Sequence, residues 1–386
     1  MTLRQAAVMP VSQPHDTRSY SNSDSIEVID DVTTDERGKT ETAPAAADAG
    51  VHGRPAARVV RGVLRVIQAP SVSVIAATLV LATVIGVWKP TFLKPAQLLD
   101  ILQASVYVGL LAAGMAYLIS MREIDLSVGS TFALTVVTVA LLMQGGMNGW
   151  LAAAVGVGLG AVLGAVNATI IELIRIPTIV ATLATLSVFR GLGFGLTDGN
   201  QVVGLPITDS FFTVLGGTYF GVPVSVFVLA GVVLALGAVL HHTPFGYRVL
   251  AIGSNPEAAH FSGISIARVR AQVLVLMGAL AGVAGVLALA YFTSADPNIG
   301  TGFELQAIAA AVIGGTPLRG GSATVLGAAF GAILLNVVAT GLAYFNVPAN
   351  WSLFATGLVI LLAVGIDSLA RRRRAFTAAK SPGVTH

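Results

Sequence analysis

Residues 271–292 read AQVLVLMGALAGVAGVLALAYF, a run in which no side chain carries a charge. A helix rises about 1.5 Å per residue, so a run of this length covers the roughly 30 Å hydrocarbon core of a bilayer. The stretch therefore predicts a membrane-spanning helix. Similar runs follow one another from residue 71 onward, and they predict an all-α polytopic membrane protein.

The composition leads to the same class. Of the 386 residues, 55% are hydrophobic and only 11% are charged, which is too little charge to cover the surface of a water-soluble domain. The chain has no cysteine, so disulfides and thiolate metal sites are excluded. The scattered histidines share no helix face with carboxylates, and we expect neither a metal site nor any other cofactor.

About ten membrane-spanning helices are expected. The segment 303–316 is short for a crossing and is expected to be a re-entrant or broken helix, so eight or nine spans remain the alternative. The ten segments are 71–88, 98–120, 127–144, 149–173, 177–196, 222–240, 271–292, 303–316, 322–343 and 350–370.

The distribution of arginine predicts the orientation. Arginines precede the first span and Arg371 to Arg374 follow the last, which places both chain ends in the cytoplasm by the positive-inside rule. We expect a disordered acidic tail over residues 1–55, a permease domain over 56–374 and a short tail over 375–386. The N-terminal tail lacks the pattern of a cleaved signal peptide, so the first span is expected to remain as an anchor.

The longest internal loop on this topology, residues 241–270, contains the polar stretch GSNPEAAHFSGISIARV at 253–269. Ser254 and Asn255 can each cap a helix, Glu257 places a negative charge near its positive end, and Gly263 is typical of a helix stop. A helix of about two turns is too short to persist alone in water. It is either a connector at the membrane surface or a docking element for a cytoplasmic partner, and the residues alone leave both open.

Four stretches together resemble the permease subunits of monosaccharide ABC importers, of the ribose, xylose, rhamnose and autoinducer-2 type. The resemblance covers most of residues 90–370 in family order. The stretches are TPFGYRVLAIG with NPEAAHFSGI at 243–264, EIDLSVGS at 123–130, IPTIVATLATLSVFRGL at 176–192, and ADPNIGTGFELQAIAAAVIGGTPLRGGSATVLGAAFGAILLN at 295–336. The chain departs from the family pattern at Arg122, Gln306 and Pro317.

The resemblance implies a multi-pass protein of the inner or plasma membrane that works in an assembly. Its partners would be a second permease subunit, identical or paralogous, two cytosolic ATP-binding subunits, and an extracytoplasmic sugar-binding protein. The short helix would dock on the ATPase. The residues expected to couple to the ATPase are Asn255, Glu257, Ala258, Ala259 and Gly263.

A translocation pathway for a neutral sugar should be lined by uncharged hydrogen-bonding groups with an aromatic residue or two. Arg190 could contact solute or merely pair with a buried acid or with carbonyl groups, and Asp125 with Ser127 is expected to cap the third span. The pathway residues expected from the sequence are Gln103, Tyr107, Asp125, Asn167, Thr185, Arg190 and Asn336.

Several other activities are excluded or disfavoured. No GxxxxGK[ST] phosphate loop occurs, so the chain is not expected to be an enzyme or to hydrolyse ATP alone. Arg371 to Arg374 suit a lipid-headgroup anchor and not a nucleic-acid patch, and GVGLGAVLGA at 156–165 suits helix packing and not dinucleotide binding. A branched-chain amino-acid ABC permease and, less favoured, an ion-coupled secondary transporter remain as alternatives.

Overall fold

The computed structural model describes residues 70–348 and the isolated positions 351, 354, 357, 358, 361 and 365. The expected tail 1–55, nearly all of the expected span 350–370, the arginine run 371–374 and the expected tail 375–386 lie outside the described residues. All structural statements below refer to the described part.

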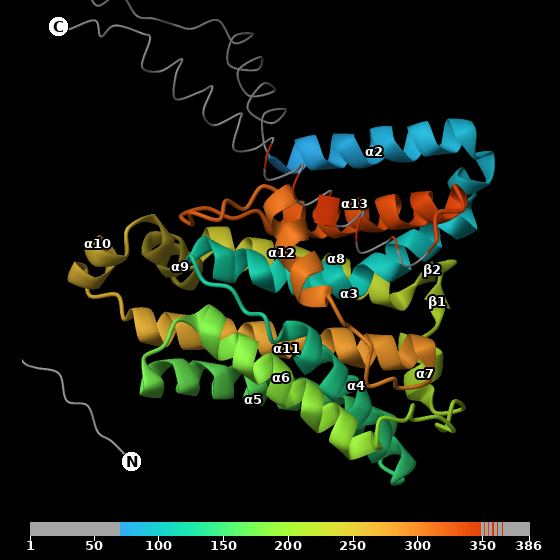
Figure 1. The fold of residues 1–386 in the computed structure, drawn as a ribbon, viewed down its shortest axis with the longest axis horizontal. Coiled ribbons are helices and arrows are strands. Elements are labelled where there is room, and N and C mark those ends of the chain that lie inside the picture. Colours follow the sequence, from blue (N-terminus) through green and yellow to red (C-terminus); the bar gives the residue numbers. More distant parts are fainter. Residues whose placement is uncertain are drawn as a thin grey trace, which may run out of the picture. The chain divides into compact units, whose positions relative to one another are not determined.

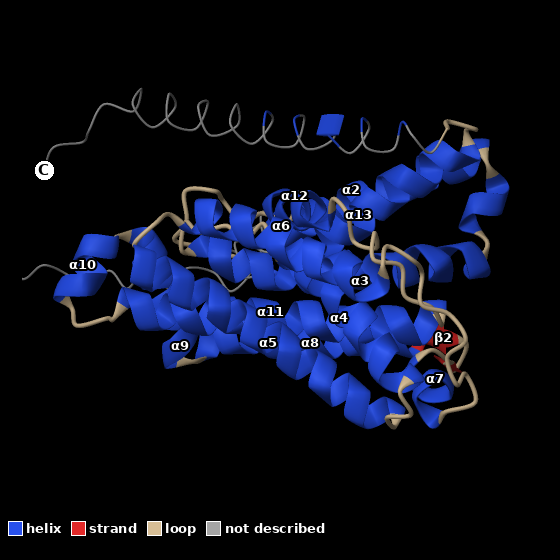
Figure 2. Ribbon diagram, turned by 60° about the horizontal axis from the view of Figure 1, so that its bottom comes forward, coloured by secondary structure: helices blue, strands red, loops and turns tan. Residues whose placement is uncertain are grey.

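Helices account for nearly all of its regular structure (Figures 1 and 2). The long helices are α2 (Pro70–Trp88), α3 (Pro95–Ser120), α4 (Val128–Gln144), α5 (Gly149–Ile174), α6 (Thr178–Thr197), α8 (Val224–His242), α11 (Ile266–Phe292) and α13 (Val325–Tyr344). The short elements are η1 (Pro90–Leu93), α7 (Ser210–Leu215), α9 (Pro244–Ser254), α10 (Pro256–Phe261), α12 (Phe303–Ile313) and the antiparallel strands β1 (Thr218–Tyr219) and β2 (Val222–Pro223).

Nine of the ten predicted membrane spans correspond to helices in the described part, two of them short, and the tenth, 350–370, lies mostly outside it. Within the described residues, seven helices are long and apolar enough to cross a membrane, namely α2, α3, α5, α6, α8, α11 and α13. Helices α4 and α12 are shorter, with 17 and 11 residues. The expected short or broken helix near 303–316 is therefore confirmed as α12, and α4 joins it as a second short helix.

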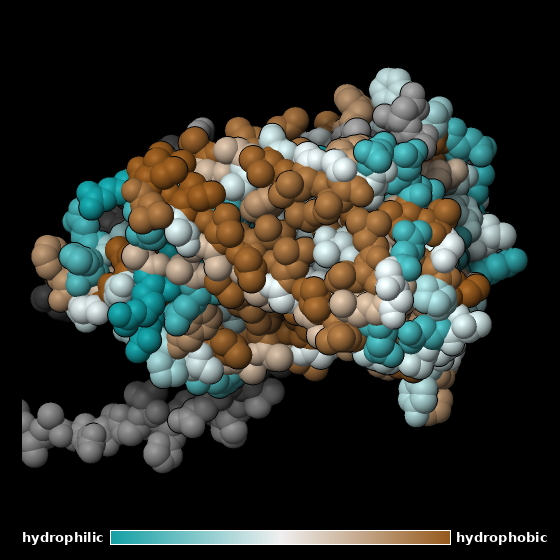
Figure 3. Space-filling view, turned by 90° about the horizontal axis from the view of Figure 1, so that it is seen from below, coloured by the Kyte–Doolittle hydropathy of each residue, from teal (hydrophilic) through white to brown (hydrophobic). Residues whose placement is uncertain are grey.

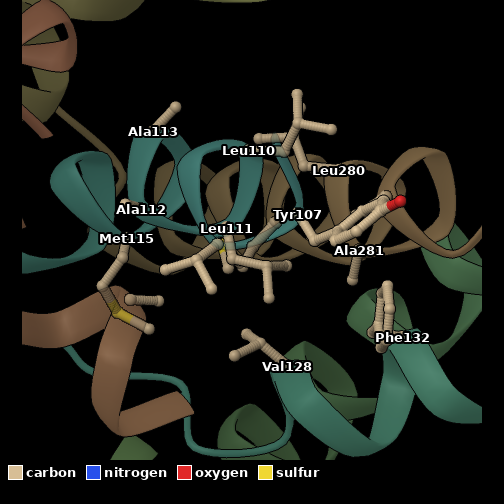
Figure 4. Packing of buried hydrophobic residues seen from close by; sticks show 14 of the residues in the cluster. Tyr107, Leu110, Leu111, Ala112, Ala113, Met115, Val128, Phe132, Leu280 and Ala281 are labelled. Carbon is tan, nitrogen blue, oxygen red and sulfur yellow. The ribbon is translucent and has the colours of Figure 1, made fainter. Parts of the chain in front are cut away.

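Helix α3 lies at the centre of the bundle and contacts α8, α11, α12 and α13. Its apolar side chains pack against Leu280 and Ala281 of α11 and against Val128 and Phe132 of α4 (Figure 4). Helices α5 and α11 approach closely at glycines. A side chain at Gly160 would overlap the backbone of Gly278. Small residues that let two backbones approach are typical of helix contacts in membranes, so the packing role predicted for 156–165 is confirmed.

The outer surface of the bundle is apolar. Figure 3 shows a hydrophobic band on one face, with polar residues gathered toward both ends. Large exposed apolar side chains such as Leu173 of α5, Leu183 of α6 and Leu234 of α8 are 55–78% exposed. Such a surface is stable against lipid tails, where no water has to be ordered around it.

Two segments repeat one unusual pattern of long helix, non-helical return and short helix. Helix α3 is followed by residues 121–127 and α4, and α11 is followed by residues 293–302 and α12. The beginnings of the two short helices meet, with the rings of Phe132 and Phe303 at 5.3 Å. Because Phe132 also contacts Tyr107 near the midpoint of α3, both short helices begin at about the middle of the bundle. Short helices of this kind are typical of transporters.

The two ends of the bundle differ. The predicted internal loop 241–270 holds α9, α10 and the first turn of α11, and α9 was not expected. Its start is set by Pro244 and by Thr243, whose hydroxyl accepts a hydrogen bond from the Gly246 amide at 3.2 Å. The opposite end carries α7 and the β1–β2 hairpin, which were also not expected (Figure 1).

Candidate functional site

A cavity of about 320 Å³ lies where the two short helices begin. Five helices contribute to its wall, which places it at the centre of the bundle. The aromatic side chains form a linked group, with the Tyr107 ring 6.1 Å from Phe132 and 5.9 Å from Phe292. The lining residues are Ala104, Tyr107, Val108, Phe132, Phe292, Ile299, Phe303, Gln306, Leu335, Asn336 and Ala339.

The polar groups of this wall are uncharged. The hydroxyl of Tyr107 accepts a hydrogen bond from Gln103 Nε2 at 2.8 Å, and Ser225 Oγ donates to Gln103 Oε1 in turn. The Tyr107 hydroxyl hydrogen therefore remains free to donate. Asn336 donates through Nδ2 to the Ala332 carbonyl at 3.1 Å, which leaves Oδ1 as an acceptor. The cavity thus combines aromatic faces with a hydroxyl and two amides.

Arg190 does not line the cavity but supports its wall. Its Nη1 donates to the carbonyl oxygens of Ile299 at 2.9 Å and Pro297 at 3.2 Å. These bonds hold the return 293–302, and Ile299 belongs to the cavity wall. Of the two roles considered from the sequence, the observed contacts are those of a side chain that pairs with carbonyls.

Three further residues expected on the pathway lie elsewhere, and two of them belong to a separate polar cluster. Asp125 Oδ1 accepts hydrogen bonds from Ser127 N at 2.8 Å and Ser127 Oγ at 2.7 Å, and Asn167 Nδ2 donates to Ser127 Oγ at 2.8 Å. Thr185 is buried on α6, where its hydroxyl donates to the Thr182 carbonyl at 3.3 Å. None of the three lines the cavity.

The expected capping role of Asp125 is only partly matched. Ser127 directly precedes α4, but no amide of the first turn of α4 donates to the Asp125 side chain. Asp125 instead closes a turn over residues 125–127 and is 2% exposed. Its function in the fold is to order the return segment that leads into the short helix.

Nine of the eleven residues of the cavity wall were not among the pathway residues expected from the sequence, and the aromatic and polar ones among them are Phe132, Phe292, Phe303 and Gln306. An aromatic residue on an apolar helix packs equally well against lipid or core, so its type carries no signal of a pathway. The one available signal was the position of Phe303 and Gln306 on the short helix near 303–316.

The predicted short helix is present as α10. Asn255 Oδ1 accepts a hydrogen bond from the Ala258 amide at 3.1 Å, Pro256 occupies the first turn, and Glu257 follows it. Gly263 has a φ of 83°, and Ile264 N donates to the Ala259 carbonyl at 3.0 Å. This is the Schellman arrangement that ends helices at glycine. Asn255 and Gly263 are therefore confirmed as the residues that end the helix, whereas Ser254, the other candidate cap, is the last residue of α9. The docking role of α10 stays a prediction.

An open groove of about 780 Å³ lies between α9 and α10. Ala258 and Ala259 line it together with Gly321. Two large aromatic side chains of these helices are strongly exposed, Phe261 at 87% and Tyr247 at 71%. Exposed aromatic residues beside a groove are typical of a surface that binds another protein.

At the other end, Asp209 joins α7 to α5. Its carboxylate accepts hydrogen bonds from Phe211 N at 2.9 Å and from Gly149 N at 3.2 Å. Because these bonds stabilise the charged form, first the bond from Phe211 and then that from Gly149, they lower the pKa of Asp209. The described residues contain no group of three or more His, Cys, Asp or Glu side chains that could hold a metal ion.

Comparison with known proteins places the sequence of this chain in a family. Residues 97–364 match the family described as branched-chain amino acid transport system / permease component. The ribose import permease protein RbsC of Bacillus subtilis (strain 168) is 39% identical over 75% of this chain and 89% of its own length. The L-arabinose ABC transporter permease protein AraH of Azospirillum brasilense is 33% identical, over 77% of this chain and 87% of its own.

The autoinducer 2 import system permease protein LsrC of Klebsiella pneumoniae is 35% identical over 78% of this chain and 88% of its own length. No solved structure matches the chain. The family match and these relatives extend across the helices that form the cavity and the groove. The chain therefore belongs to the permease component family of ABC importers and is a multi-pass inner-membrane protein.

Proposed function

We propose that the chain moves a monosaccharide through the central cavity by alternating access, in an importer driven by separate ATPase subunits. The observation that carries the proposal is the composition of the cavity wall. Sugars present hydroxyl groups on polar edges and C–H groups on flatter faces. The hydroxyl of Tyr107 and the amides of Gln306 and Asn336 suit the first, and the rings of Phe132 and Phe303 suit the second.

The names of the relatives support a sugar as the solute. They refer to ribose, L-arabinose and autoinducer 2, whereas the family description refers to branched-chain amino acids. The relatives are aligned over most of both chains, so they carry the finer information. An amino acid is the second candidate because of the family description alone.

The charges around the cavity favour the sugar over the amino acid. A substrate carboxylate would need a cation or an open helix N-terminus at this depth. The nearest arginine, Arg190, already donates to two carbonyl groups. The N-terminus of α12 carries Glu304 in its first turn, which repels a second carboxylate. An ion-coupled transporter is disfavoured because no acidic side chain lines the cavity.

The two short helices explain how access could alternate. Helices α4 and α12 begin at the cavity, and non-helical segments connect them to α3 and α11. A short helix on a non-helical connection can tilt with little change in the long helices. Binding of the solute against the rings of Phe132 and Phe303 would hold the two helix beginnings together, and their separation would open the cavity to one side.

Docking of the ATPase on α10 completes the proposal. The helix is capped at both ends, projects from the end of the bundle (Figure 1) and borders the groove with exposed aromatic residues. We further propose an extracytoplasmic sugar-binding protein and a second permease subunit as partners. The exposed apolar faces of α5 and α6 are available to lipid or to that second subunit.

The test uses the permease co-expressed with its ATPase and reconstituted in proteoliposomes, with labelled ribose, arabinose and leucine offered through the cognate binding protein. ATP-dependent uptake of a sugar, without competition by leucine, is expected. The variant Asn336→Leu should weaken uptake affinity by about tenfold, the equivalent of one lost hydrogen bond. Asn200→Leu, at an exposed position away from the cavity, is the control. Uptake of leucine that no sugar inhibits would refute the sugar proposal.

Docking is tested separately by co-purification. Glu257→Arg reverses the charge in the first turn of α10 and should reduce retention of the ATPase. Asp100→Arg makes the same reversal at an exposed position of α3 and should leave retention unchanged. Equal retention by both variants would contradict docking at α10.

A further inference from the structure

Arg122, the second residue after the end of α3, has an unusual backbone conformation. Arg122 has a φ of 66°, a left-handed conformation in which glycine is favoured and most side chains are strained. Its amide donates to the Ile119 carbonyl at 2.9 Å, so the turn at the end of α3 is well formed. The contacts of the Arg122 side chain offer a physical reason for an arginine at this strained position.

The side chain of Arg122 binds the end of another helix. Its Nε donates to the Gly253 carbonyl at 2.8 Å and its Nη2 donates to the Ser254 carbonyl at 3.0 Å. These are the last two carbonyl groups of α9. Carbonyls at a helix end lack partners within the helix and carry partial negative charge, so a cation is favoured there. Arg122 therefore caps α9 from a site 131 residues earlier in the chain.

A second contact fixes the same junction. The Ser120 carbonyl at the end of α3 accepts a hydrogen bond from Gly321 N at 2.9 Å, and Gly321 belongs to the loop that follows α12. Gly253 packs so closely on Ser120 that a side chain at 253 would overlap its carbonyl. The ends of α3 and α9 and the loop after α12 thus meet at one point.

This junction lies between the two candidate functional regions. On one side, Asn255 begins α10 directly after the capped carbonyls. On the other side, α3 runs from Arg122 toward Tyr107, and α12 runs from the loop toward Gln306, and both of these residues line the cavity. Hydrogen bonds at the junction and the helices α3 and α12 therefore connect α10 to two walls of the cavity.

We propose that Arg122 is the positioning residue that couples movement of α10 to α3. The proposal rests on the docking of the ATPase at α10. Without the two bonds from Arg122, α9 and α10 would still pack on the bundle, but their movement would no longer pull on the end of α3. ATP hydrolysis would then continue with less solute moved in each cycle.

Replacement of Arg122 by glycine tests the role of its side chain. Arg122→Gly removes the guanidinium with its two hydrogen bonds and also relieves the left-handed strain, so the two effects offset each other in part and the variant should still fold. The matched control is Arg175→Gly, because Arg175 also has a positive φ, of 59°, at the end of α5, and is exposed. Both variants replace arginine by glycine at a positive φ, and Arg122→Gly in addition loses the contacts with α9.

The experiment measures the rate of ATP hydrolysis and the rate of labelled sugar uptake in proteoliposomes that contain the whole complex. For Arg122→Gly, the number of sugars moved per ATP should fall by roughly fivefold or more, the lower end of measured coupling between sites. Arg175→Gly should keep the ratio of the parent. Retained thermal stability and ATPase co-purification show that the variant is assembled.

The outcomes separate this inference from the docking proposal. If Arg122→Gly keeps the ATPase and also the parental ratio of uptake to hydrolysis, Arg122 does not couple the two regions. If Glu257→Arg retains as much ATPase as the control Asp100→Arg, the ATPase does not dock on α10. The docking proposal is then wrong, and the coupling inference, which rests on it, is wrong as well. An equal loss of the ratio in Arg122→Gly and Arg175→Gly would assign the effect to the added glycine and would also overturn the inference.

Discussion

Replacement of Asp125 by alanine should destabilise the protein through lost hydrogen bonds at the return segment before α4. The Asp125 carboxylate accepts two bonds from Ser127, one from its amide and one from its hydroxyl. Alanine leaves both donors without this acceptor in a buried site. A buried amide without a partner costs about 1–3 kcal/mol, and the hydroxyl, which can rotate, adds about 1 kcal/mol.

The sum is about 2–4 kcal/mol, which corresponds to roughly 4–8 °C in the melting temperature at about 2 °C per kcal/mol. Asp125→Asn keeps an oxygen acceptor at the same position. The hydrogen-bond partners of Asp125, Ser127 directly and Asn167 through it, carry no charge. Asparagine should therefore remain within about 1 kcal/mol of the parent.

The assay is thermal unfolding of the detergent-purified permease, with folded yield measured by size-exclusion chromatography. Asp100→Ala is the control, because Asp100 is an exposed aspartate on α3 and its loss should change little. A parental melting temperature for Asp125→Ala would refute the reasoning. Equal losses for alanine and asparagine would show that the charge matters and the hydrogen bonds do not.

Three further predictions concern other parts of the fold. Gly160→Leu should abolish folding because its side chain would overlap the Gly278 backbone, whereas Gly158→Leu, with open space around it, should give parental yield; equal yields would argue against the α5–α11 contact. Asn255→Ala removes the cap of α10 at a cost of about 1 kcal/mol and should accelerate local proteolysis near residue 260; an unchanged cleavage rate would contradict it. The lowered pKa of Asp209 means that its contribution to stability is present above the unfolded pKa of about 3.9 and is lost as the pH falls through the lower folded pKa. Asp209→Asn should therefore flatten the acid side of a plot of melting temperature against pH, and a curve identical to that of the parent would contradict the assignment.

The candidate site was predictable in part. The sequence indicated Tyr107 and Asn336, which line the cavity, and Gln103, which bonds to Tyr107. Asp125, Asn167 and Thr185 are also polar and buried, yet none of them lines the cavity. Polarity within an apolar helix shows that a residue needs a partner, but not whether that partner is solute or protein.

The sequence by itself determined the elements whose causes are local. The membrane spans follow from the length of apolar runs relative to the bilayer, and the ends of α10 follow from Asn255 and Gly263, which act on their own neighbouring amides and carbonyls. The short helix α12 was visible for the same reason, since its apolar run is too short to cross.

The tertiary structure alone decided which residues of distant segments face one another. The meeting of Phe132 with Phe303 and the capping of α9 by Arg122 join segments more than a hundred residues apart. In helices that are apolar on every side, hydrophobicity does not select a direction of rotation, because lipid and protein interior are equally favourable surroundings for an apolar side chain. Close packing at small residues and hydrogen bonds between helices make that selection, and both arise only when the partner helix is in place.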